Sequence, residues 1–382
     1  MTSHNERPTI LVESRIEMQL AHRLLFLCLL SLACFTSVEA AKPRVETGSF
    51  GKLPNGEEVN QFNLYNSNGM QATIVEYGAT VTKLLVADRN GKFANVVLGT
   101  ESLEDYTKGF PAASVIGRYA NRIRGAKFTL DNQTYEVTKN AGDNHIHGGR
   151  ENFAKVRWSG TAESGEDSAA VKLTYRSKDG EEGFPGELDV SVTYRLTNAN
   201  ELSIQYEAKT DKATVVNLTN HAYFNLGPAN EDVLNHELQI MAQTYTISDK
   251  SLIPTGEITS VVGTPLDFLA PHRIGERIEQ VYEAAGGYDH NYIVSGKVGE
   301  LRQAARVVDP KSGRIMECLT TEPGVQLYTA NGFNGNPFPK HGGFCLETQH
   351  YPDSPNRPEF PTTAVRPGTP FKSTTVFRFS AK

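Results

Sequence analysis

In the stretch LDVSVTYRL at residues 188–196, apolar side chains occupy every second position. A period of two is typical of a β-strand that buries one face and exposes the other. The same texture, rich in Val, Ile, Thr, Tyr and Phe, recurs along most of the 382-residue chain. The clearest further runs are residues 72–77, 81–87, 170–175, 202–208 and 374–379. We therefore expect a chain made mainly of short antiparallel strands.

Turn residues separate these runs. The segments DRNGK at 88–92 and LDNQT at 130–134 lie between strand-like runs and predict hairpin turns. Helical signals are few, namely one or two turns at 102–106 and a longer candidate at 274–285. The texture is nearly uniform, so we predict one all-β domain at 46–382, a large antiparallel β-sandwich or barrel with few short helices. The order of its strands does not follow from this pattern.

The composition is that of an ordinary soluble protein, with 38% hydrophobic and 21% charged residues. The net charge of −6 and the lack of any block of Lys and Arg argue against a nucleic-acid partner or an anionic membrane surface. No Gly-rich loop joins a predicted strand to a helix, which argues against a nucleotide-binding motif. The sequence leaves the oligomeric state open.

The first 40 residues differ in character from the rest. A basic stretch precedes the apolar run LLFLCLLSLACF at 24–35, and VEA at 38–40 supplies small residues at a cleavage-like spacing. These features are typical of a secretory signal peptide, and the apolar run is short for a transmembrane helix. We therefore expect a signal peptide at 1–40 and an exported protein, periplasmic or secreted, without stable membrane association after cleavage. An uncleaved anchor and lipidation at Cys34 are less favoured alternatives.

Two of the four cysteines, Cys28 and Cys34, lie in the expected signal peptide, so the mature chain keeps Cys318 and Cys345. Two cysteines cannot form a disulfide framework for a domain of this size, and nothing indicates that they pair. We expect both to be small buried apolar residues.

Polar residues concentrate in six runs whose neighbours are aromatic residues or glycine. These runs are GRYANRI at 117–123, NHIHGG at 144–149, NHAYFNL at 220–226, GYDHNYI at 287–293, TTEPGVQLYTAN at 320–331 and GFCLETQ at 343–349. Such mixtures suit a sugar, because hydroxyl groups need paired donors and acceptors while the C–H faces of the ring pack on aromatic surface.

The last four runs are specific in their combination, order and spacing, and they indicate a resemblance to a known family. The chain resembles the aldose 1-epimerase family, also called galactose mutarotases, over residues 46–380. The resemblance implies the large β-sandwich of that family, in agreement with the strand pattern. It also implies an isomerase that interconverts the α and β anomers of free hexoses such as glucose and galactose. The implied partner is a small monosaccharide.

The resemblance further implies roles for individual residues. His221 matches the general acid, Glu347 matches the general base, and His147 matches a second active-site histidine. Further positions match sugar-contacting residues or lie in the run of the acid and are expected to line the pocket: Asn121, Arg122, Tyr223, Phe224, Asp289 and Gln326. The export signal is unusual, since many members of the family are intracellular.

These residue types suit the chemistry of mutarotation. The anomeric hydroxyl must lose a proton while the ring oxygen gains one, so that the hemiacetal opens to the aldehyde. A carboxylate can take the first proton and an imidazolium can supply the second, each typically contributing about 10²- to 10⁴-fold in rate. Nothing is oxidised and no group is transferred, so we expect neither a cofactor nor a metal.

Several alternatives stay open at this point. His145 and His147, with His221 and Asp289, could be imagined as metal ligands, although the turn residues between them make this less favoured. Asp289 and Glu347 could be the carboxylate pair of a glycoside hydrolase.

The chain could also be a non-catalytic sugar-binding module, or a hexose-6-phosphate 1-epimerase whose phosphate binds a basic pocket. Arg118 and Arg124 compete with Arg122 for the sugar-contacting role, and His290 is interpreted as a structural neighbour of Asp289.

Overall fold

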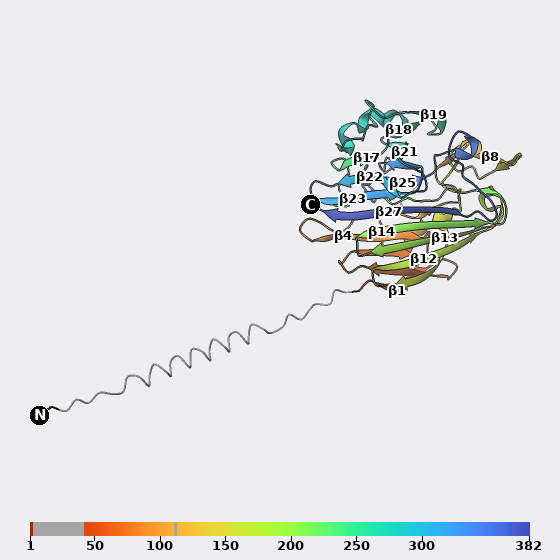
Figure 1. Ribbon diagram of the computed structural model, residues 1–382. Coiled ribbons are helices and arrows are strands. Elements are labelled where there is room, and N and C mark those ends of the chain that lie inside the picture. The colour runs from red at the N-terminus through yellow and green to blue at the C-terminus, as the bar shows by residue number, and fades with distance from the viewer. Residues whose placement is uncertain (3–41, 111–112) are drawn as a thin grey trace. The chain divides into compact units, whose positions relative to one another are not determined.

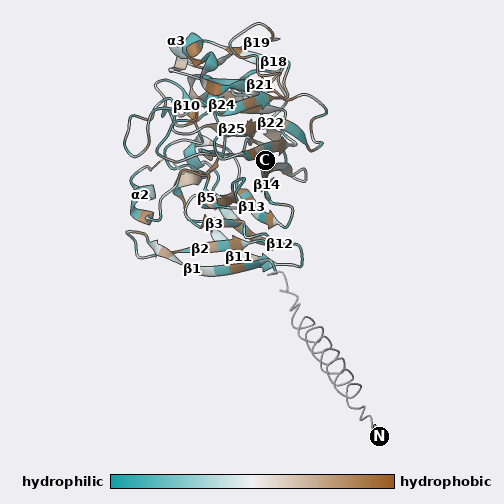
Figure 2. Ribbon diagram, turned by 90° about the vertical axis from the view of Figure 1, so that its left-hand side faces the viewer, coloured by the Kyte–Doolittle hydropathy of each residue, from teal (hydrophilic) through white to brown (hydrophobic). Residues whose placement is uncertain are grey.

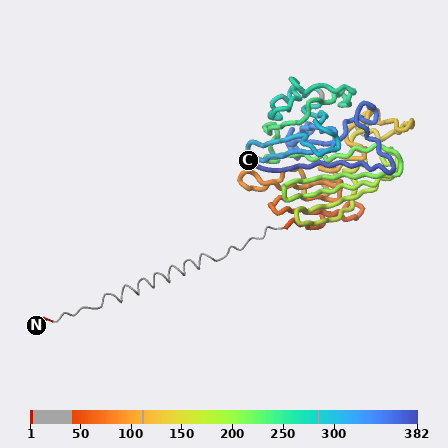
Figure 3. Tube along the Cα trace, viewed as in Figure 1, coloured from red at the N-terminus to blue at the C-terminus, as the bar shows by residue number. Residues whose placement is uncertain are grey.

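A long antiparallel sheet runs through the computed structural model, which describes residues 1–2, 42–110 and 113–382. Within these residues the sheet has nine strands, in the order β11 (Ser159–Ser164), β12 (Ser168–Ser177), β13 (Leu188–Thr197), β14 (Glu201–Thr210), β27 (Phe371–Ala381), β23 (Arg314–Thr320), β22 (Arg302–Val308), β17 (Glu237–Ile240) and β20 (His272–Arg273). The last strand of the chain, β27, therefore lies between β14 and β23 (Figures 1 and 3). This placement joins the first half of the sheet to the second.

A five-stranded meander packs against one half of this sheet. Its strands follow in chain order, β1 (Arg44–Lys52), β2 (Glu58–Tyr65), β3 (Gln71–Val75), β4 (Thr80–Ala87) and β5 (Phe93–Asn95). Strands β1 to β3 contact β11 to β13, and β4 contacts β27. Hydrophobic and hydrophilic residues are interspersed along the strands (Figure 2). The alternation is clearest in β13, where every second residue is buried in the core.

A second five-stranded sheet carries several of the candidate site residues. Its order is β19 (Pro254–Ser260), β18 (Thr244–Ser248), β21 (Asp289–Ile293), β24 (Gly324–Tyr328) and β25 (Cys345–Gln349). One of its faces is apolar and joins the main hydrophobic core, with Tyr292 of β21, Leu327 of β24 and Leu346 of β25 buried there. The side chains between them point to the opposite face.

Short ladders and turns complete the fold. The paired short strands are β6 (Val115–Ile116) with β16 (Thr219–Asn220), β7 (Arg122–Ile123) with β10 (His145–Ile146), β8 (Lys127–Leu130) with β9 (Gln133–Glu136), and β15 (Thr214–Val215) with β26 (Ala364–Val365). The helical segments are α2 (Leu103–Thr107), α3 (Tyr282–Ala285) and the 3₁₀ turns η1 (Arg124–Ala126), η2 (Phe153–Lys155), η3 (Glu181–Gly183), η4 (Ile274–Glu276), η5 (Ile278–Val281) and η6 (Ser354–Asn356). No helix among the described residues is long and apolar enough to span a bilayer.

The strand predictions are confirmed, since all six runs coincide with strands. The two hairpin turns are confirmed as well. At 88–92, Gly91 donates to the carbonyl of Asp88 between β4 and β5. In the turn between β8 and β9, Asp131 and Asn132 both have positive φ, 52° and 63°, as a two-residue hairpin of type I′ requires.

The predicted helices have different outcomes. The short one is confirmed as α2, whose N-cap Ser102 accepts a hydrogen bond from the backbone of Asp105. The longer one at 274–285 is wrong, because η4, η5 and α3 divide this segment. The backbone N–H of Gly275 donates to the carbonyl of Leu234 instead, and Arg277 has φ −130° and ψ 9°, which interrupts a helix.

Residues 42–382 form one compact unit. The predicted signal peptide at 1–40 falls outside the described residues apart from the first two, as do Cys28 and Cys34. The expectation for the other two cysteines is confirmed, because Cys318 and Cys345 are both buried and free.

Candidate active site

The floor of the site is the polar face of the sheet that contains β21, β24 and β25. Residues that pair directly in neighbouring antiparallel strands point to the same face. The registers place Asn291 beside Gln326 and Gln326 beside Glu347. This polar row across three strands brings two of the predicted site residues together, although they lie far apart in the sequence.

A second row on the same face lies two residues further along each strand. Here Asp289 pairs with Tyr328, and Tyr328 pairs with Cys345. The sequence predicted neither Tyr328 nor Cys345 as a site residue. The signal that could have found them is the period of two, since Tyr328 follows Gln326, and Cys345 precedes Glu347, by two positions in a strand.

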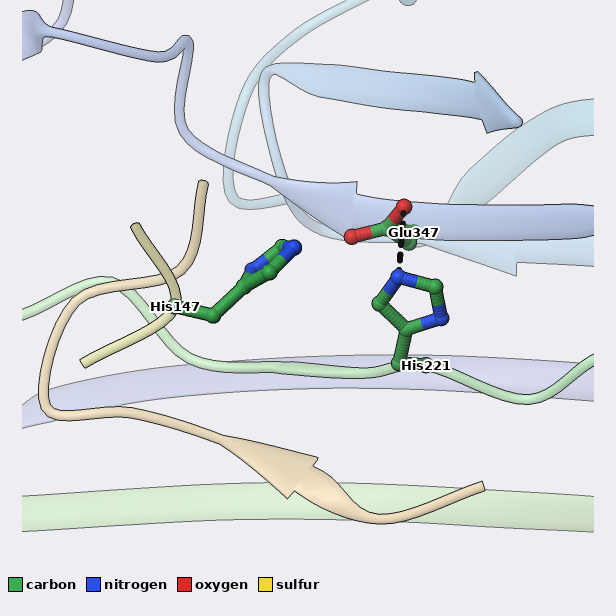
Figure 4. Close-up of side chains that lie close together, drawn as sticks. All are labelled: His147, His221 and Glu347. Atoms are coloured by element: carbon green, nitrogen blue, oxygen red, sulfur yellow. Dashed lines mark ion pairs between the residues drawn. The ribbon is translucent and has the colours of Figure 1, made fainter. Parts of the chain in front are cut away.

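His221 reaches this face from a different part of the chain. It follows the short strand β16 in an extended segment, and its backbone N–H donates to the carbonyl of Ser114. Its Nε2 lies 3.5 Å from Oε1 of Glu347. The dashed line in Figure 4 marks this pair. The two side chains are only 12% and 2% exposed, respectively, so water screens their interaction weakly.

The environment of Glu347 favours a carboxyl group that holds a proton more readily than usual. Burial raises its pKa, and the nearby carboxylate of Asp289 adds to this, while His221 and Arg122 oppose it. Its Oε2 has no hydrogen-bond partner among the described residues. A buried oxygen left unpaired is costly unless a ligand completes its bonding, so this atom can accept a hydrogen bond from a bound hydroxyl group.

His147 is held in one orientation by the backbone of Asn121. The N–H of Asn121 donates to Nδ1 of His147 at 3.2 Å, and the N–H of His147 donates to the carbonyl of Asn121 at 3.0 Å. Because Nδ1 accepts, the proton of the neutral ring is on Nε2. Burial, and the nearby His221 and Arg122, lower the pKa of His147 well below its usual value. His147 is therefore a neutral hydrogen-bond donor, with its ring edge-on to that of His221 at 5.3 Å.

The donor atoms of His147, His221 and Glu347 all lie within 4.8 Å of one another, which raises the question of a metal. A histidine that binds a metal through one nitrogen normally donates a hydrogen bond from the other. In His147 the Nδ1 accepts instead, so this group does not fit a metal. The four residues imagined as ligands do not assemble either. His145 points away, with Nδ1 bonded to the carbonyl of Thr138 and its ring against Phe184. The positive φ of His147, 52°, ends the strand and separates the two histidines.

The remaining predicted polar residues form one connected group. Nη2 of Arg122 lies 3.5 Å from Oδ2 of Asp289, and Nε2 of Gln326 donates to Oδ1 of the same carboxylate at 2.5 Å. Oδ1 of Asn121 accepts hydrogen bonds from the backbone N–H of Arg122 at 2.9 Å and from its Nη1 at 3.4 Å, so Asn121 helps to hold the arginine side chain. Oε1 of Gln326 is buried without a partner in the described residues, like the free oxygen of Glu347.

The two aromatic residues after His221 behave differently. The ring of Tyr223 lies 4.9 Å from that of His221 and 5.0 Å from that of Phe333, so it supports one face of the imidazole. The structure does not bring Phe224 to the site. Its ring packs on Phe344 and Phe377 in the main core, because consecutive residues of an extended segment point to opposite sides.

The competing arginines are engaged elsewhere. The guanidinium of Arg118 is buried and donates to backbone carbonyls, including those of Pro185 and Gly186. Arg124 is half-exposed and pairs with Asp249. Only Arg122, of these three, contacts Asp289, so the three do not form the basic cluster that a sugar phosphate would need.

His290 lies beside the site rather than in it. Its Nδ1 accepts the backbone N–H of Asp289, and its ring packs against Tyr245 and Tyr288. This arrangement agrees with the interpretation of His290 as a structural neighbour.

Comparison with known proteins gives a consistent result. The family model of aldose 1-epimerases matches residues 60–378. The human galactose mutarotase is 44% identical over 341 residues, which cover 87% of this chain and 97% of that protein. The aldose 1-epimerase of Escherichia coli K12 is 36% identical, covering 86% and 97%. The crystal structure of a galactose 1-epimerase from Lactobacillus acidophilus NCFM superimposes with a TM-score of 0.80 at 29% identity, covering 89% of this chain and 99% of that one. The chain therefore belongs to the aldose 1-epimerase family.

Proposed function

We propose that this protein is an aldose 1-epimerase that interconverts the α and β anomers of free hexoses such as glucose and galactose. The observation that carries the proposal is the 3.5 Å approach of Nε2 of His221 to Oε1 of Glu347 in a buried polar site. One proton donor and one proton acceptor at this spacing can serve the two oxygens attached to the same anomeric carbon. The names of its relatives, a galactose mutarotase and an aldose 1-epimerase, support this function.

The proposed reaction begins with the ion pair of Glu347 and protonated His221. Glu347 takes the proton of the anomeric hydroxyl, and His221 gives its Nε2 proton to the ring oxygen. The bond from the anomeric carbon to the ring oxygen breaks, and the hydroxyl oxygen becomes the aldehyde carbonyl. Rotation about the C1–C2 bond then presents the other face of the carbonyl. Closure with the reverse proton transfers gives the other anomer and restores both side chains.

The connected group of Arg122, Asp289 and Gln326 is proposed to hold the hydroxyl groups distant from the anomeric carbon. Arg122 and Gln326 hold the two carboxylate oxygens of Asp289 in place, so the lone pairs left free on these oxygens point in a defined direction. The neutral Nε2–H of His147 would donate to a sugar oxygen. These contacts would keep the open-chain sugar in place, so that it closes again before it leaves.

The test is the decay of optical rotation of fresh α-glucose and α-galactose with the protein far below the sugar concentration. Catalysis predicts a faster approach to the same final rotation, whereas a sugar-binding module would leave the decay at its spontaneous rate. Glucose 6-phosphate, assayed in parallel, should be a poor substrate because the arginines are not clustered. Release of an aryl alcohol from aryl glycosides would instead support a hydrolase.

We also propose that the protein is exported by the signal peptide expected at 1–40. The support is the order of a basic stretch, the short apolar run at 24–35 and the small residues at 38–40. Sequencing the N-terminus of the mature protein from its native host tests this proposal. A mature chain that begins close to residue 41 is expected, and a chain that retains the apolar run would contradict it.

A further inference from the structure

The Nδ1 atom of His221, which faces away from Glu347, has a partner of its own. The Sγ atom of Cys345 lies 3.5 Å from it. Cys345 and Glu347 are two residues apart in β25 and so project from the same face of that strand. A single strand therefore contacts both nitrogens of the proposed acid, the carboxylate on one side and the thiol on the other.

The thiol of Cys345 stays neutral in this position. Its side chain is fully buried, and burial raises its pKa well above the usual value, with Glu347 and Asp289 adding to the effect. A neutral thiol is both a weak donor and a weak acceptor of hydrogen bonds. It can donate S–H to an unprotonated Nδ1, or rotate its hydrogen away and accept from a protonated one.

The weak acceptor role of the thiol matches what the proposed reaction requires at Nδ1 of His221. When the imidazolium releases its Nε2 proton to the ring oxygen, the neutral ring that remains still carries the proton on Nδ1. A carboxylate at Nδ1 would hold the imidazolium strongly and raise its pKa, which would make it a poorer acid. A sulfur atom accepts only weakly, so it can orient the ring while the Nε2 proton stays easy to transfer.

No other side chain among the described residues makes a hydrogen bond to Nδ1 of His221. The titratable or charged groups that surround the ring from the neighbouring elements are Glu347 and Cys345 on β25, Tyr328 on β24, Tyr223 on its own segment and His147 after β10, with Asp289 and Arg122 beyond Glu347. The aromatic rings support the faces and edges of the imidazole, and Glu347 faces the other nitrogen. Orientation through Nδ1 therefore depends on Cys345.

We propose that Cys345 is a positioning residue whose thiol accepts a weak hydrogen bond from Nδ1–H of His221 and so keeps the ring oriented during ring opening and closure. This inference rests on the proposed mutarotase function, because it assigns His221 the transfer of the proton at Nε2. It gives Cys345 a role beyond that of a small residue filling the core.

The experiment compares Cys345→Ala and Cys345→Ser with Cys318→Ala, which removes the other buried free cysteine, in β23. Polarimetric progress curves give kcat and KM for glucose across the pH range. We expect Cys345→Ala to lower kcat about 3- to 10-fold, the value of one modest hydrogen bond, with KM changed less than twofold. The alkaline limb of its kcat profile should move to lower pH, because the Nδ1 proton of the imidazolium loses its acceptor. Cys345→Ser should recover part of both effects, and Cys318→Ala should show neither.

Two results would overturn the proposal. One is a Cys345→Ala enzyme with the same kcat and alkaline limb as Cys318→Ala. The other is a Cys345→Ser enzyme whose kcat and alkaline limb are no closer to wild type than those of Cys345→Ala, which would assign the loss to packing. Should Cys345→Ala not fold, Cys345→Ser is compared with Cys318→Ser: a shift confined to the first supports the role, and identical profiles refute it. Failure of the function itself is distinguishable, because the unmutated protein would then not accelerate mutarotation at all.

Discussion

Asn121 and His147 exchange two hydrogen bonds, from the backbone N–H of Asn121 to the ring Nδ1 and from the backbone N–H of His147 to the carbonyl of Asn121. The exchange leaves His147 as a donor through Nε2, and burial keeps its pKa well below the usual value. His147 should therefore contribute to sugar binding at neutral pH rather than transfer a proton.

Replacement of His147 tests this assignment. We expect His147→Ala to raise KM for glucose about 5- to 10-fold, the value of one buried hydrogen bond, with a smaller loss in kcat. His147→Gln keeps an N–H donor and should recover part of the affinity. Initial rates by polarimetry over a range of sugar concentrations separate the two constants. A loss confined to kcat would contradict a binding role.

Removal of either member of the acid–base pair should abolish most of the activity. We expect Glu347→Gln and His221→Asn each to lower kcat about 10²- to 10⁴-fold with KM within a few-fold. The matched control is Glu322→Gln, because Glu322 is also a buried carboxylate beside a histidine, with Oε2 2.6 Å from Nδ1 of His350. That change should reduce thermal stability and leave kcat near the wild-type value. Near wild-type turnover in both site variants would refute the mechanism.

Loss of charge at Asp289 should act mainly on binding. Asp289→Asn weakens the pairing with Arg122 and alters the hydrogen bond from Gln326, so the group proposed to contact the sugar loses its fixed geometry. We expect KM to rise about 10-fold with a smaller change in kcat. Asp249→Asn, which removes a partner of the half-exposed Arg124, is the control and should leave both constants unchanged. Equal effects of the two substitutions would mean that the loss is not specific to the site.

The acid limb of the pH–rate profile should belong to Glu347. As the proposed base, Glu347 must be ionised, and burial raises its pKa above the usual 4.5. We therefore expect kcat to fall, as the pH is lowered, at a higher pH than for an ordinary glutamate. A profile that stays flat down to pH 4.5 would exclude Glu347 as the base.

The same shift predicts an effect on stability. A carboxyl group whose pKa is higher in the folded state costs nothing below its unfolded pKa, where it is neutral in both states, and destabilises the fold as the pH rises through the folded value. Glu347→Gln should therefore melt at a higher temperature than wild type at pH 7.5. The difference should shrink or vanish at pH 4. Scanning calorimetry at the two pH values measures this difference. We expect the inactive variant to be more stable than wild type only at the pH where the carboxylate of Glu347 would be charged.

Strands and local turns could be predicted because their signals are local. The period of two at 188–196 requires only neighbouring residues, and so does the Asp131–Asn132 hairpin. The position of β27 between β14 and β23 could not be predicted, since pairing between distant strands leaves no such pattern. The segment 274–285 has helical composition, but the backbone N–H of Gly275 donates to the carbonyl of the distant Leu234 instead of to a carbonyl within a helix.

The site residues divide in a similar way. The motif runs predicted His147, His221 and Glu347, and the structure brings their donor atoms together. The runs could not show which way each side chain points. Phe224 lies next to Tyr223 in sequence but faces the core, and Cys345, predicted only to be buried, contacts the imidazole.

The alternation along β25 limits how this enzyme can be re-engineered. Glu347 faces His221 in the polar site and Leu346 faces the hydrophobic core, so a deletion or insertion of one residue just before them would exchange the two. The register of the strand is thus as essential as the carboxylate itself. Libraries aimed at other aldoses should substitute side chains in place on β21, β24 and β25, and should confine changes of length to the connecting loops.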